Sequence, residues 1–429
     1  MTYEETTKFL FEQLPMYQRQ GKSAYKADLK TTLELDRYFD HPHKHYRTIH
    51  VAGTNGKGSV SHMLASVLME AGYKTGLYTS PHLRDFRERI KVNGRMIPES
   101  EVVSFVEENR DIIEKLKPSF FEMTAAMAFE YFKKAEVDVA VIETGMGGRL
   151  DSTNIISPDL SVITNIGLDH TQFLGNTKPL IAKEKAGIIK PGTPVVIGET
   201  DDETIGVFAE KAKEMKAPLI QADKIYRIPF SAFSQDNKQI MQVYSGDTLK
   251  YKDLKVSLPG WYQKKNVITA LASLDSLKTS GYKIEESHIY KGLEKVQEAT
   301  GLLGRWQIIG NNPRIICDTG HNEAGVREIV NQIKNTPYKK LHIVWGMVND
   351  KDLAPVLKLL PQDAAYYFTR ASIPRSLDEN KLAEEAKKYG LKGKSYPDVK
   401  TALSEAKKNA GPNDLIFIGG STFIVADIL

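Results

Sequence analysis

Hydrophobic residues along the chain fall into short apolar runs separated by segments with helical spacing. In the first half of the chain, the runs that predict strands lie at residues 47–51, 75–78, 137–142 and 160–164. After the first run, the apolar positions that repeat on one helix face are Val60, Met63, Leu64, Val67, Leu68 and Ala71. The run at 137–142 is nearly all apolar, as in a strand buried on both faces. This pattern predicts a doubly wound, mainly parallel sheet with helices between its strands.

The second half of the chain begins with a change of pattern. Residues 224–260 are polar and alternating, which predicts a small appended β region. From about residue 313 a second alternation of strand and helix patterns follows. Its predicted strands are residues 314–317, 341–345, 365–369 and 415–418. We therefore expect an α/β protein with a larger domain over residues 1–300 and a smaller, Rossmann-like domain over residues 301–429.

Composition and charge narrow the class of protein. The 429 residues are 41% hydrophobic and 26% charged, a globular balance that excludes a largely disordered chain. The 58 Lys and Arg against 54 Asp and Glu give a net charge of +4, without the basic excess of a dedicated nucleic-acid binder. No apolar run approaches the roughly 18 residues of a membrane span. The lone cysteine, Cys317, lies in an apolar strand and fits a reducing compartment, so we expect a cytoplasmic protein that binds neither nucleic acid nor membrane.

The glycine-rich stretch after the first predicted strand is the sharpest chemical signal. It consists of Gly53, Thr54, Asn55, Gly56, Lys57, Gly58 and Ser59. It resembles a P-loop, although Val51 stands in place of the first glycine and Gly58 intervenes before the hydroxyl residue. Glycines let backbone N–H groups surround an anion, and the N-terminus of the following helix favours a phosphate. We expect Lys57 to neutralise phosphate charge and Ser59 to supply a hydroxyl. The alternative is that the glycine-rich stretch is a flexible turn with no ligand.

Polar residues follow the ends of three other predicted strands. Glu143 ends one strand, Ser80 follows another, and His170 follows a third. Because ligands bind at the carboxyl ends of the strands in such sheets, the three residues form a candidate metal-binding rim. A carboxylate oxygen is a good ligand for Mg²⁺. If Glu143 stood alone, a solvated charge at the end of the strand would be the better interpretation. Histidine is an unusual magnesium ligand, so a contact through His170 suggests a second, less demanding site.

Residue type and spacing alone do not decide the role of Lys185. A bare ammonium beside Mg²⁺ would be repelled. Lys185 could therefore act only as a counter-charge to the substrate, or after conversion to an anionic carbamate. A solvated helix charge fits the spacing equally well.

Three residues in the last third of the chain are candidate nucleotide ligands. Asp318 follows a predicted strand and could bind a ribose hydroxyl or a metal, and His321 could bind a phosphate or a base edge. The alternative is a turn that leads into a helix capped by Asn322. Arg305 could reach a phosphate, or it could be an ordinary surface arginine.

Two further patterns indicate structural elements and not binding or catalytic sites. His41, His43 and His45 alternate, as in some metal-binding tracts, but Pro42 indicates a loop and the run lacks a partner cluster. Residues 350–352 are acidic and basic in alternation and predict a helix entry.

Taken together, these stretches resemble a known family. The sequence is similar to the folylpolyglutamate synthase/dihydrofolate synthase family, within the Mur ligase superfamily of ATP-dependent amide-forming ligases. The matching residues are 50–59, 79–83, 121–125, 143–151, 163–170, 184–191, 258–260, 263, 266, 304–305, 346–347, 350–352 and 420–421. They occur in the family's order from about residue 50 to the C-terminus.

The resemblance implies a role for each site residue. Residues 53–59 would bind the ATP phosphates. Ser80 and Glu143 would hold one Mg²⁺, and Glu143 with His170 a second, while Lys185 matches the lysine that is carbamylated in this family. The residues expected to contact the nucleotide across an interdomain cleft are Asn266, Arg305, Asp318 and His321. The expected catalytic groups are Lys57, Glu143, His170 and Lys185.

A few positions depart from the family's pattern and leave every catalytic group in place. Tyr262 stands where histidine is more common, and Leu303 replaces a proline. Thr319 and Gly320 replace a Gly-Ala pair. The first fifty residues match least clearly, and they include the segment around residues 27–32, where members that accept dihydropteroate carry a pterin-binding motif.

The resemblance implies an ATP-dependent ligase that adds L-glutamate to dihydropteroate or to the glutamate tail of a folate, through an acyl phosphate. The expected ligands are ATP, two Mg²⁺ ions, dihydropteroate or tetrahydrofolate, and L-glutamate, and we expect a monomer. A cell-wall Mur ligase shares the chemistry but uses a UDP-linked substrate, and no UDP-dedicated segment precedes the phosphate loop. A regulatory P-loop NTPase, or a nucleotide-binding module without catalysis, is the alternative from another class. The Lys185 segment and the pair Glu143 and His170 argue against the NTPase, and the intact set of candidate groups argues against the non-catalytic module.

Overall fold

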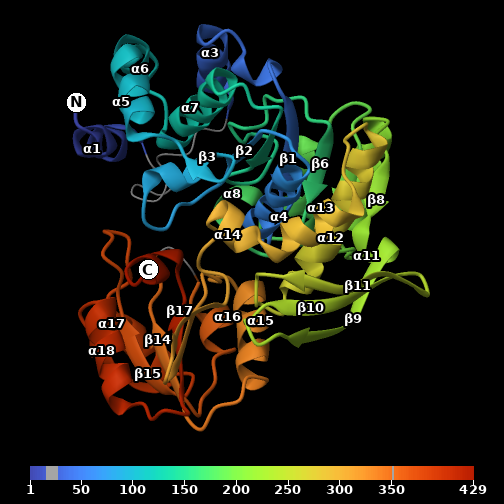
Figure 1. The fold of residues 1–429 in the computed structure, drawn as a ribbon. Helices are drawn as coiled ribbons and strands as arrows, with labels where there is room; N and C mark the ends of the chain where they lie inside the picture. Colours follow the sequence, from blue (N-terminus) through green and yellow to red (C-terminus); the bar gives the residue numbers. More distant parts are fainter. Residues whose placement is uncertain (16–27, 350–351) are drawn as a thin grey trace. The chain divides into compact units, whose positions relative to one another are not determined.

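The computed structural model describes residues 1–15, 28–349 and 352–429 (Figure 1). They form two compact units. Residues 1–257 and 263–302 make up the first unit, and residues 258–262 and 303–429 make up the second. The sequence assigns residues 258–262 to the larger domain, whereas in the structure this short segment packs with the second unit.

The first unit is built around an eight-stranded sheet with the order β4-β3-β2-β5-β1-β6-β7-β8. Its strands are β1 (Arg47–Ala52), β2 (Thr75–Tyr78), β3 (Ile90–Val92), β4 (Arg95–Met96), β5 (Val139–Glu143), β6 (Leu160–Ile163), β7 (Val195–Ile197) and β8 (Leu219–Gln221). Neighbouring strands pair in parallel except at one edge, where β3 is antiparallel to both β2 and β4. The central strand β1 lies between β5 and β6, with Val51 opposite Glu143 and Ala52 opposite Ile163. These three strands therefore end at the same edge of the sheet.

The other elements of the first unit are mainly helical. Its α-helices are α1 (Tyr3–Gln13), α3 (Lys30–Tyr38), α4 (Lys57–Glu70), α5 (Glu99–Glu108), α6 (Arg110–Leu116), α7 (Phe120–Lys134), α8 (Thr171–Leu174), α9 (Lys178–Lys185), α10 (Ile205–Glu214), α11 (Ala222–Ile225), α12 (Gln263–Thr279), α13 (Glu286–Glu294) and α14 (Val296–Thr300). The short 3₁₀ helices are η2 (Pro42–Lys44), η3 (Phe86–Arg89) and η4 (Ala186–Ile188). Capping boxes at Thr2 and Ser119 satisfy the first N–H groups of α1 and α7.

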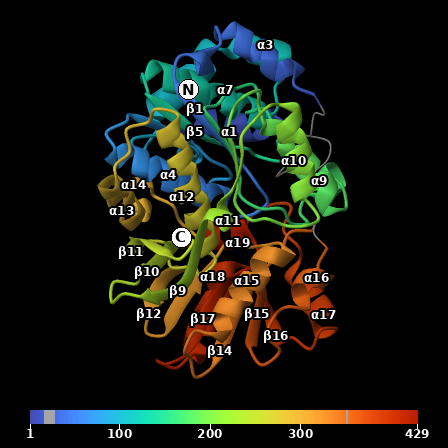
Figure 2. The same cartoon turned by 90° about the vertical axis from the view of Figure 1, so that its right-hand side faces the viewer.

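Helices cover both faces of this sheet. On one face α4 contacts β1, β2 and β5, and α12 contacts α4, β6 and β7. On the other face Tyr78 and Ile142 pack into an apolar cluster with α7, and Ile163 packs into a second cluster with α9 and α10. Figure 2 shows α4 and α12 on one side of the sheet and α9 and α10 on the other. The predicted doubly wound fold is therefore confirmed.

The polar segment after β8 folds as a separate three-stranded antiparallel sheet, in the order β11-β10-β9. Its strands are β9 (Tyr226–Phe233), β10 (Gln239–Ser245) and β11 (Thr248–Val256). In β10, Gln239, Met241 and Val243 are buried and alternate with more exposed residues, as expected of a sheet with one covered face. This sheet confirms the appended β region predicted at residues 224–260.

The second unit contains a six-stranded sheet with the order β12-β13-β17-β14-β15-β16. Its strands are β12 (Gln307–Asn311), β13 (Arg314–Cys317), β14 (Leu341–Trp345), β15 (Ala365–Thr369), β16 (Lys392–Tyr396) and β17 (Leu415–Gly419). Its helices are α15 (Glu323–Lys334), α16 (Ala354–Leu357), α17 (Glu379–Lys387), α18 (Val399–Asn409) and α19 (Thr422–Ala426). Only β12 is antiparallel to its neighbour among these strands, so the α/β fold predicted for this part of the chain is confirmed.

The lone cysteine of the chain lies in the second unit. Cys317 is buried at the end of β13, and burial raises the pKa of its thiol to about 12, as expected of a core residue. In the described part of the chain, no helix has the length and apolar character needed to cross a membrane. The predicted helix entry at residues 350–352 lies mostly outside the described residues, because only Asp352 is described; its carboxylate accepts the N–H of Ala354 at 3.2 Å.

Candidate functional site

The glycine-rich loop joins the end of β1 to the start of α4, at the carboxyl edge of the central strand. Its Gly53 and Gly56 have φ angles of 148° and 85°, which residues with a Cβ rarely adopt. A Cβ at Gly53 would lie 1.8 Å from Thr164 Oγ1, and one at Gly56 would lie 2.3 Å from Asn266 Oδ1. Both positions therefore require glycine, and the backbone comes close to its neighbours there.

The loop that follows β6 fixes the shape of the glycine-rich loop. Thr164 Oγ1 donates to the carbonyl of Asn55 at 2.6 Å, and the N–H of Asn55 donates to Asn165 Oδ1 at 2.9 Å. Thr54 Oγ1 bridges the N–H and the carbonyl of Gly167 at 3.0 and 3.1 Å. These bonds hold the loop in one conformation. The sequence assigns no role to Thr164 or Asn165, and their place directly after a strand is the only signal of one.

The first turn of α4 carries the predicted phosphate ligands. Lys57 is half-buried, and its Nζ lies 3.2 Å from the Gly53 carbonyl and 3.4 Å from the Thr54 carbonyl. Ser59 is buried, and its Oγ accepts from Gln263 Nε2 at 3.2 Å. Asn266 Nδ2 donates to Gln263 Oε1 at 2.7 Å. Asn266 therefore lies beside the loop, linked to Ser59 through Gln263, and the sequence did not indicate this link.

Glu143 and Ser80 are brought together at the same edge of the sheet. The carboxylate of Glu143 is buried at the end of β5, and its Oε2 accepts the backbone N–H of Ser80 at 3.2 Å. The guanidinium of Arg89 is also buried, and it interacts electrostatically with Glu143. His170 caps the start of α8 with a left-handed φ of 50°, in the loop after β6.

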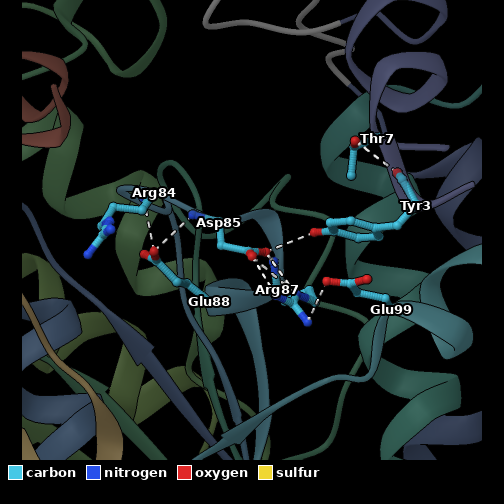
Figure 3. Close-up of polar contacts among 7 residues, drawn as sticks. All are labelled: Tyr3, Thr7, Arg84, Asp85, Arg87, Glu88 and Glu99. Atoms are coloured by element: carbon cyan, nitrogen blue, oxygen red, sulfur yellow. Dashed lines mark hydrogen bonds and ion pairs between the residues drawn. The ribbon is translucent and has the colours of Figure 1, made fainter. Parts of the chain in front are cut away.

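Acidic groups shape the loop between β2 and β3, which carries Ser80. The carboxylate of Glu88 accepts the backbone N–H groups of Arg84 and Asp85, both at 2.9 Å, and so closes the turn before η3. Asp85 in turn accepts the guanidinium of Arg87 at 2.7 Å and the hydroxyl of Tyr3 in α1 at 2.8 Å (Figure 3). The N-terminal helix is thereby tied to this loop.

Lys185 lies buried against the glycine-rich loop. Its Nζ donates to the carbonyl of Gly53 at 2.7 Å, and only 3% of the residue is exposed. Burial and then the nearby Lys57 lower the pKa of Lys185 to about 7, against the opposing charges of Asp169 and Asp151. The structure therefore excludes the alternative of a solvated helix charge for Lys185.

The glycines after β5 allow the close packing that buries Lys185. A Cβ at Gly148 would lie 2.9 Å from the carbonyl oxygens of both Glu184 and Lys185. The neighbouring Arg149 donates its backbone N–H to the Glu184 carbonyl at 2.8 Å and pairs with the Glu184 carboxylate at 2.9 Å. The loop that begins at Glu143 is thus packed directly on the end of α9.

In the second unit, Asp318 is the centre of a hydrogen-bond network. Its buried carboxylate accepts the Tyr262 hydroxyl at 2.6 Å, the Trp306 N–H at 2.7 Å and the Gly320 N–H at 2.8 Å. Burial raises the pKa of Asp318 even so. The contact with Tyr262 ties the segment 258–262 to this unit and was not indicated by the sequence.

The other candidates of the second unit gather around Thr319, one residue after Asp318. Arg305 hydrogen-bonds the Thr319 hydroxyl, and His321 Nδ1 lies 3.0 Å from the Thr319 carbonyl. Asn322 caps α15 by accepting the N–H of Gly325 at 2.9 Å, which confirms the helix cap considered for this turn. Arg305, Asp318 and His321 therefore lie close together within the second unit.

Comparison with known proteins is decisive about the family. A model of the Mur ligase middle domain matches residues 51–274, and a model of the Mur ligase glutamate ligase domain matches residues 304–422. A dihydrofolate synthase/folylpolyglutamate synthase of Bacillus subtilis is 34% identical over 419 residues, which cover 95% of this chain and 95% of that protein. The chain belongs to the dihydrofolate synthase/folylpolyglutamate synthase family of Mur ligases. The resemblance seen in the sequence is confirmed.

Further relatives and solved structures agree with this family. A probable bifunctional folylpolyglutamate synthase/dihydropteroate synthase of Haloferax volcanii is 32% identical over the whole chain, which spans 50% of that longer protein. A structure of Escherichia coli FolC in complex with DHPP and ADP has a TM-score of 0.86 and 30% identity, covering 99% of this chain and 96% of that chain. The Yersinia pestis folylpolyglutamate synthase/dihydrofolate synthase with AMPPNP and a Mn ion has a TM-score of 0.83 and 30% identity, covering 99% and 97%.

Proposed function

We propose that this member of the family joins L-glutamate to a carboxylate of dihydropteroate or of a folate glutamate tail, at the expense of ATP. One observation carries the proposal. Lys185, which is buried and has a lowered pKa, donates a hydrogen bond to the Gly53 carbonyl at the start of the glycine-rich loop. A phosphate loop alone would suit any NTPase. A buried lysine whose pKa is lowered to about 7 at the same loop suits the family's ligase chemistry.

The glycine-rich loop and α4 would bind the ATP phosphates. The positive φ angles of Gly53 and Gly56 give the loop the turn that leads into α4, and the N-terminus of α4 adds a favourable dipole for an anion. Lys57 would neutralise charge on the transferred phosphate, and Ser59 offers its hydroxyl from the first turn. The ADP and AMPPNP in the structures of the relatives support this assignment.

Ser80, Glu143 and His170 would hold the divalent metal. The donor set fits, because a buried carboxylate at the strand end is a hard oxygen ligand of the kind that Mg²⁺ prefers. A bound Mg²⁺ would neutralise phosphate charge and polarise the transferred group. The Mn ion with AMPPNP in the Yersinia pestis relative supports a divalent cation, and the two-ion arrangement is part of this proposal.

Lys185 would act as a carbamate. Its neutral amine can add to carbon dioxide to form a carbamate and release a proton, which would turn a cation that repels the metal into an anion. Replacement by alanine should abolish turnover, and short carboxylates should restore part of it by standing in for the carbamate. Unchanged activity of Lys185→Ala would contradict this role.

In the proposed reaction, a carboxylate oxygen of the acceptor attacks the γ-phosphorus of ATP, and ADP leaves with the electrons of the broken P–O bond. The neutral amine of L-glutamate then attacks the acyl carbon, a C–N bond forms, and phosphate leaves as the amine loses its proton. Lys57 would stabilise the charge that develops during the transfer. The predicted nucleotide contacts of Asn266, Arg305, Asp318 and His321 belong to the same proposal.

A parallel assay of three acceptors tests the function. The protein is incubated with MgATP and L-glutamate and with dihydropteroate, tetrahydrofolate or a UDP-muramyl peptide, and both ADP and amide product are measured. Glutamate-dependent product with either pterin substrate is expected. Product with the UDP-linked acceptor alone would indicate a cell-wall ligase, and ADP release that ignores every acceptor would indicate an NTPase.

Assembly and location complete the proposal. We expect the enzyme to act as a monomer in the cytoplasm. Analytical ultracentrifugation at micromolar concentration should give a single species near the chain mass of 48.1 kDa. A stable dimer would contradict the monomer.

A further inference from the structure

The histidine-rich segment between α3 and β1 folds back onto α3. Asp40 and His41 both have left-handed φ angles, of 55° and 50°, which turn the chain sharply after the helix. The backbone N–H of His41 then donates to the carbonyl of Asp36 at 2.8 Å. The following 3₁₀ helix η2 presents His43 to the same helix. Two of the three alternating histidines therefore reach one aspartate, although the sequence alone favours a plain loop.

Asp36, His41 and His43 form a compact cluster, which we call the Asp-His-His cluster. His41 Nδ1 lies 2.5 Å from Asp36 Oδ2, and His43 Nε2 lies 3.3 Å from Asp36 Oδ1. One ligand atom from each residue lies within 4.8 Å of the other two. His45 is exposed and is not a member of the cluster.

The interior of the cluster leaves a polar atom unsatisfied. Asp36 is 6% exposed, and its Oδ1 has no hydrogen bond of normal geometry among the described residues. His43 Nε2 lies 3.3 Å from this oxygen, a long contact that leaves room for a cation between the two atoms. Thr32 Oγ1 is also buried without a hydrogen bond, and Thr32 and Asp36 line the same small cavity beside Pro42 and Phe129. A buried carboxylate oxygen without a donor is costly, and a bound cation would remove that cost.

The donors of the cluster suit a transition metal. Burial lowers the pKa of His43 against the opposing charge of Asp36, with Lys44 and His41 adding to the lowering, so the ring nitrogen is available as a ligand near neutral pH. Two imidazoles and one carboxylate match zinc, whereas Mg²⁺ prefers a set made of oxygens alone.

The geometry of the cluster is also close to that of a zinc site. Zinc bonds of about 2.0–2.2 Å in a tetrahedron place neighbouring ligand atoms roughly 3.4 Å apart. The 3.3 Å between His43 and Asp36 is already at that spacing. The shorter contact of His41 has to open by less than about 1 Å to reach the tetrahedral spacing, and the His41 side chain is 38% exposed and has room to move.

We propose that Asp36, His41 and His43 bind one Zn²⁺ ion, with water completing the coordination on the exposed side of His41. The ion would clamp the segment that leads directly into β1, the strand that ends in the glycine-rich loop. The site is separate in sequence from the proposed Mg²⁺ ligands Ser80, Glu143 and His170. Its effect would be on the rigidity of the first unit and not on the chemistry of the ligase.

Zinc titration of the untagged, EDTA-treated full chain tests the proposal. The titration is done with a chromophoric zinc competitor in 10 mM Mg²⁺, roughly ten-thousandfold above micromolar zinc, so that Mg²⁺ occupies its own sites. The wild-type chain should bind one equivalent of Zn²⁺ and should unfold at a higher temperature with it. Asp36→Asn and His41→Ala should each weaken binding at least about tenfold, and Co²⁺ in place of zinc should give the visible absorption of a four-coordinate site.

His45→Ala is the matched control, because it removes an adjacent histidine outside the cluster. It should bind Zn²⁺ like the wild type. If Asp36→Asn fails to fold, His41→Ala decides the question, since His41 is half-exposed and its removal empties no core. No saturable zinc binding by the wild-type chain would overturn the proposal, and so would unchanged binding by His41→Ala or an equal loss in His45→Ala.

Discussion

Replacement of Lys185 by methionine should make the protein more stable at neutral pH while it abolishes turnover. Burial, followed by the charge of Lys57, lowers the pKa of Lys185 from 10.5 to about 7. Each pKa unit corresponds to about 1.4 kcal/mol, so keeping this lysine in the folded state costs about 4 kcal/mol at pH 7. The lost hydrogen bond to the Gly53 carbonyl offsets about 1 kcal/mol of the gain. We therefore expect Lys185→Met to raise the free energy of unfolding by about 3 kcal/mol.

The pH dependence of this difference has a definite sign. Between pH 7 and pH 10.5 the unfolded chain holds more protons on Lys185 than the folded chain does, so the stability of the wild type rises with pH in this window. The electrostatic part of this advantage is full below about pH 7, shrinks through the window, and vanishes near pH 10.5, where the lost hydrogen bond leaves Lys185→Met less stable than the wild type by about 1 kcal/mol. Methionine does not titrate, so the variant lacks this dependence.

Urea unfolding at pH 7, 8.5 and 10 measures the difference. The buffers must be free of carbon dioxide, because a carbamate would remove the positive charge from the wild type. Lys183→Met is the matched control, since Lys183 is exposed on the same helix, and it should change the free energy of unfolding by less than about 0.5 kcal/mol. A difference between wild type and Lys185→Met that does not vary with pH would refute the reasoning.

Three further substitutions test the site and its supports. Lys57→Ala should lower kcat at least about 100-fold with an unchanged urea midpoint, and near-normal turnover in a steady-state assay would contradict the phosphate-loop assignment. Gly56→Ala places a methyl group against a side chain at a φ of 85° and should cost about 1–3 kcal/mol in thermal unfolding, whereas Gly206→Ala, which meets nothing within 4 Å, should cost none. Tyr262→Phe removes a hydroxyl that donates to the buried Asp318 and should lower the free energy of unfolding by about 1–3 kcal/mol in urea; no change would show that this bond contributes nothing.

The sequence predicts the strands best where an apolar run is bounded by polar or turn residues. β2, β13, β14 and β15 have the predicted bounds, because each is a short apolar run that ends abruptly. β7 and β8 have three residues each and β4 has two, which is too short for any pattern to stand out. The antiparallel β12 was missed as well, since its residues are half-buried and carry no clear alternation.

The candidate site also contains residues that the sequence reveals and residues that it does not. Residues next to strand ends could be found from the sequence, because the topology of a parallel sheet brings those ends to one edge. The state of Lys185 could not, because its burial depends on Gly148 and on a contact with Gly53 that lies 132 residues away in the chain. The hydrogen bond from Gln263 to Ser59 could not be predicted for the same reason, since the two residues are 204 positions apart in the chain.

Lys57 would have opposite effects on Lys185 before and after carbamylation. As a free amine, Lys185 is destabilised in its charged form by burial and by Lys57, so about half of it is neutral at pH 7, against roughly one part in 3,000 for an ordinary lysine. Only the neutral amine can add to carbon dioxide. Once the carbamate forms, its negative charge would be attracted by the same Lys57 that repelled the ammonium. The charge that makes the amine reactive would thus hold the product in place. Removing Lys57 should therefore reduce carbamate occupancy twice over, by returning the amine to its charged form and by leaving the anion without its counter-charge.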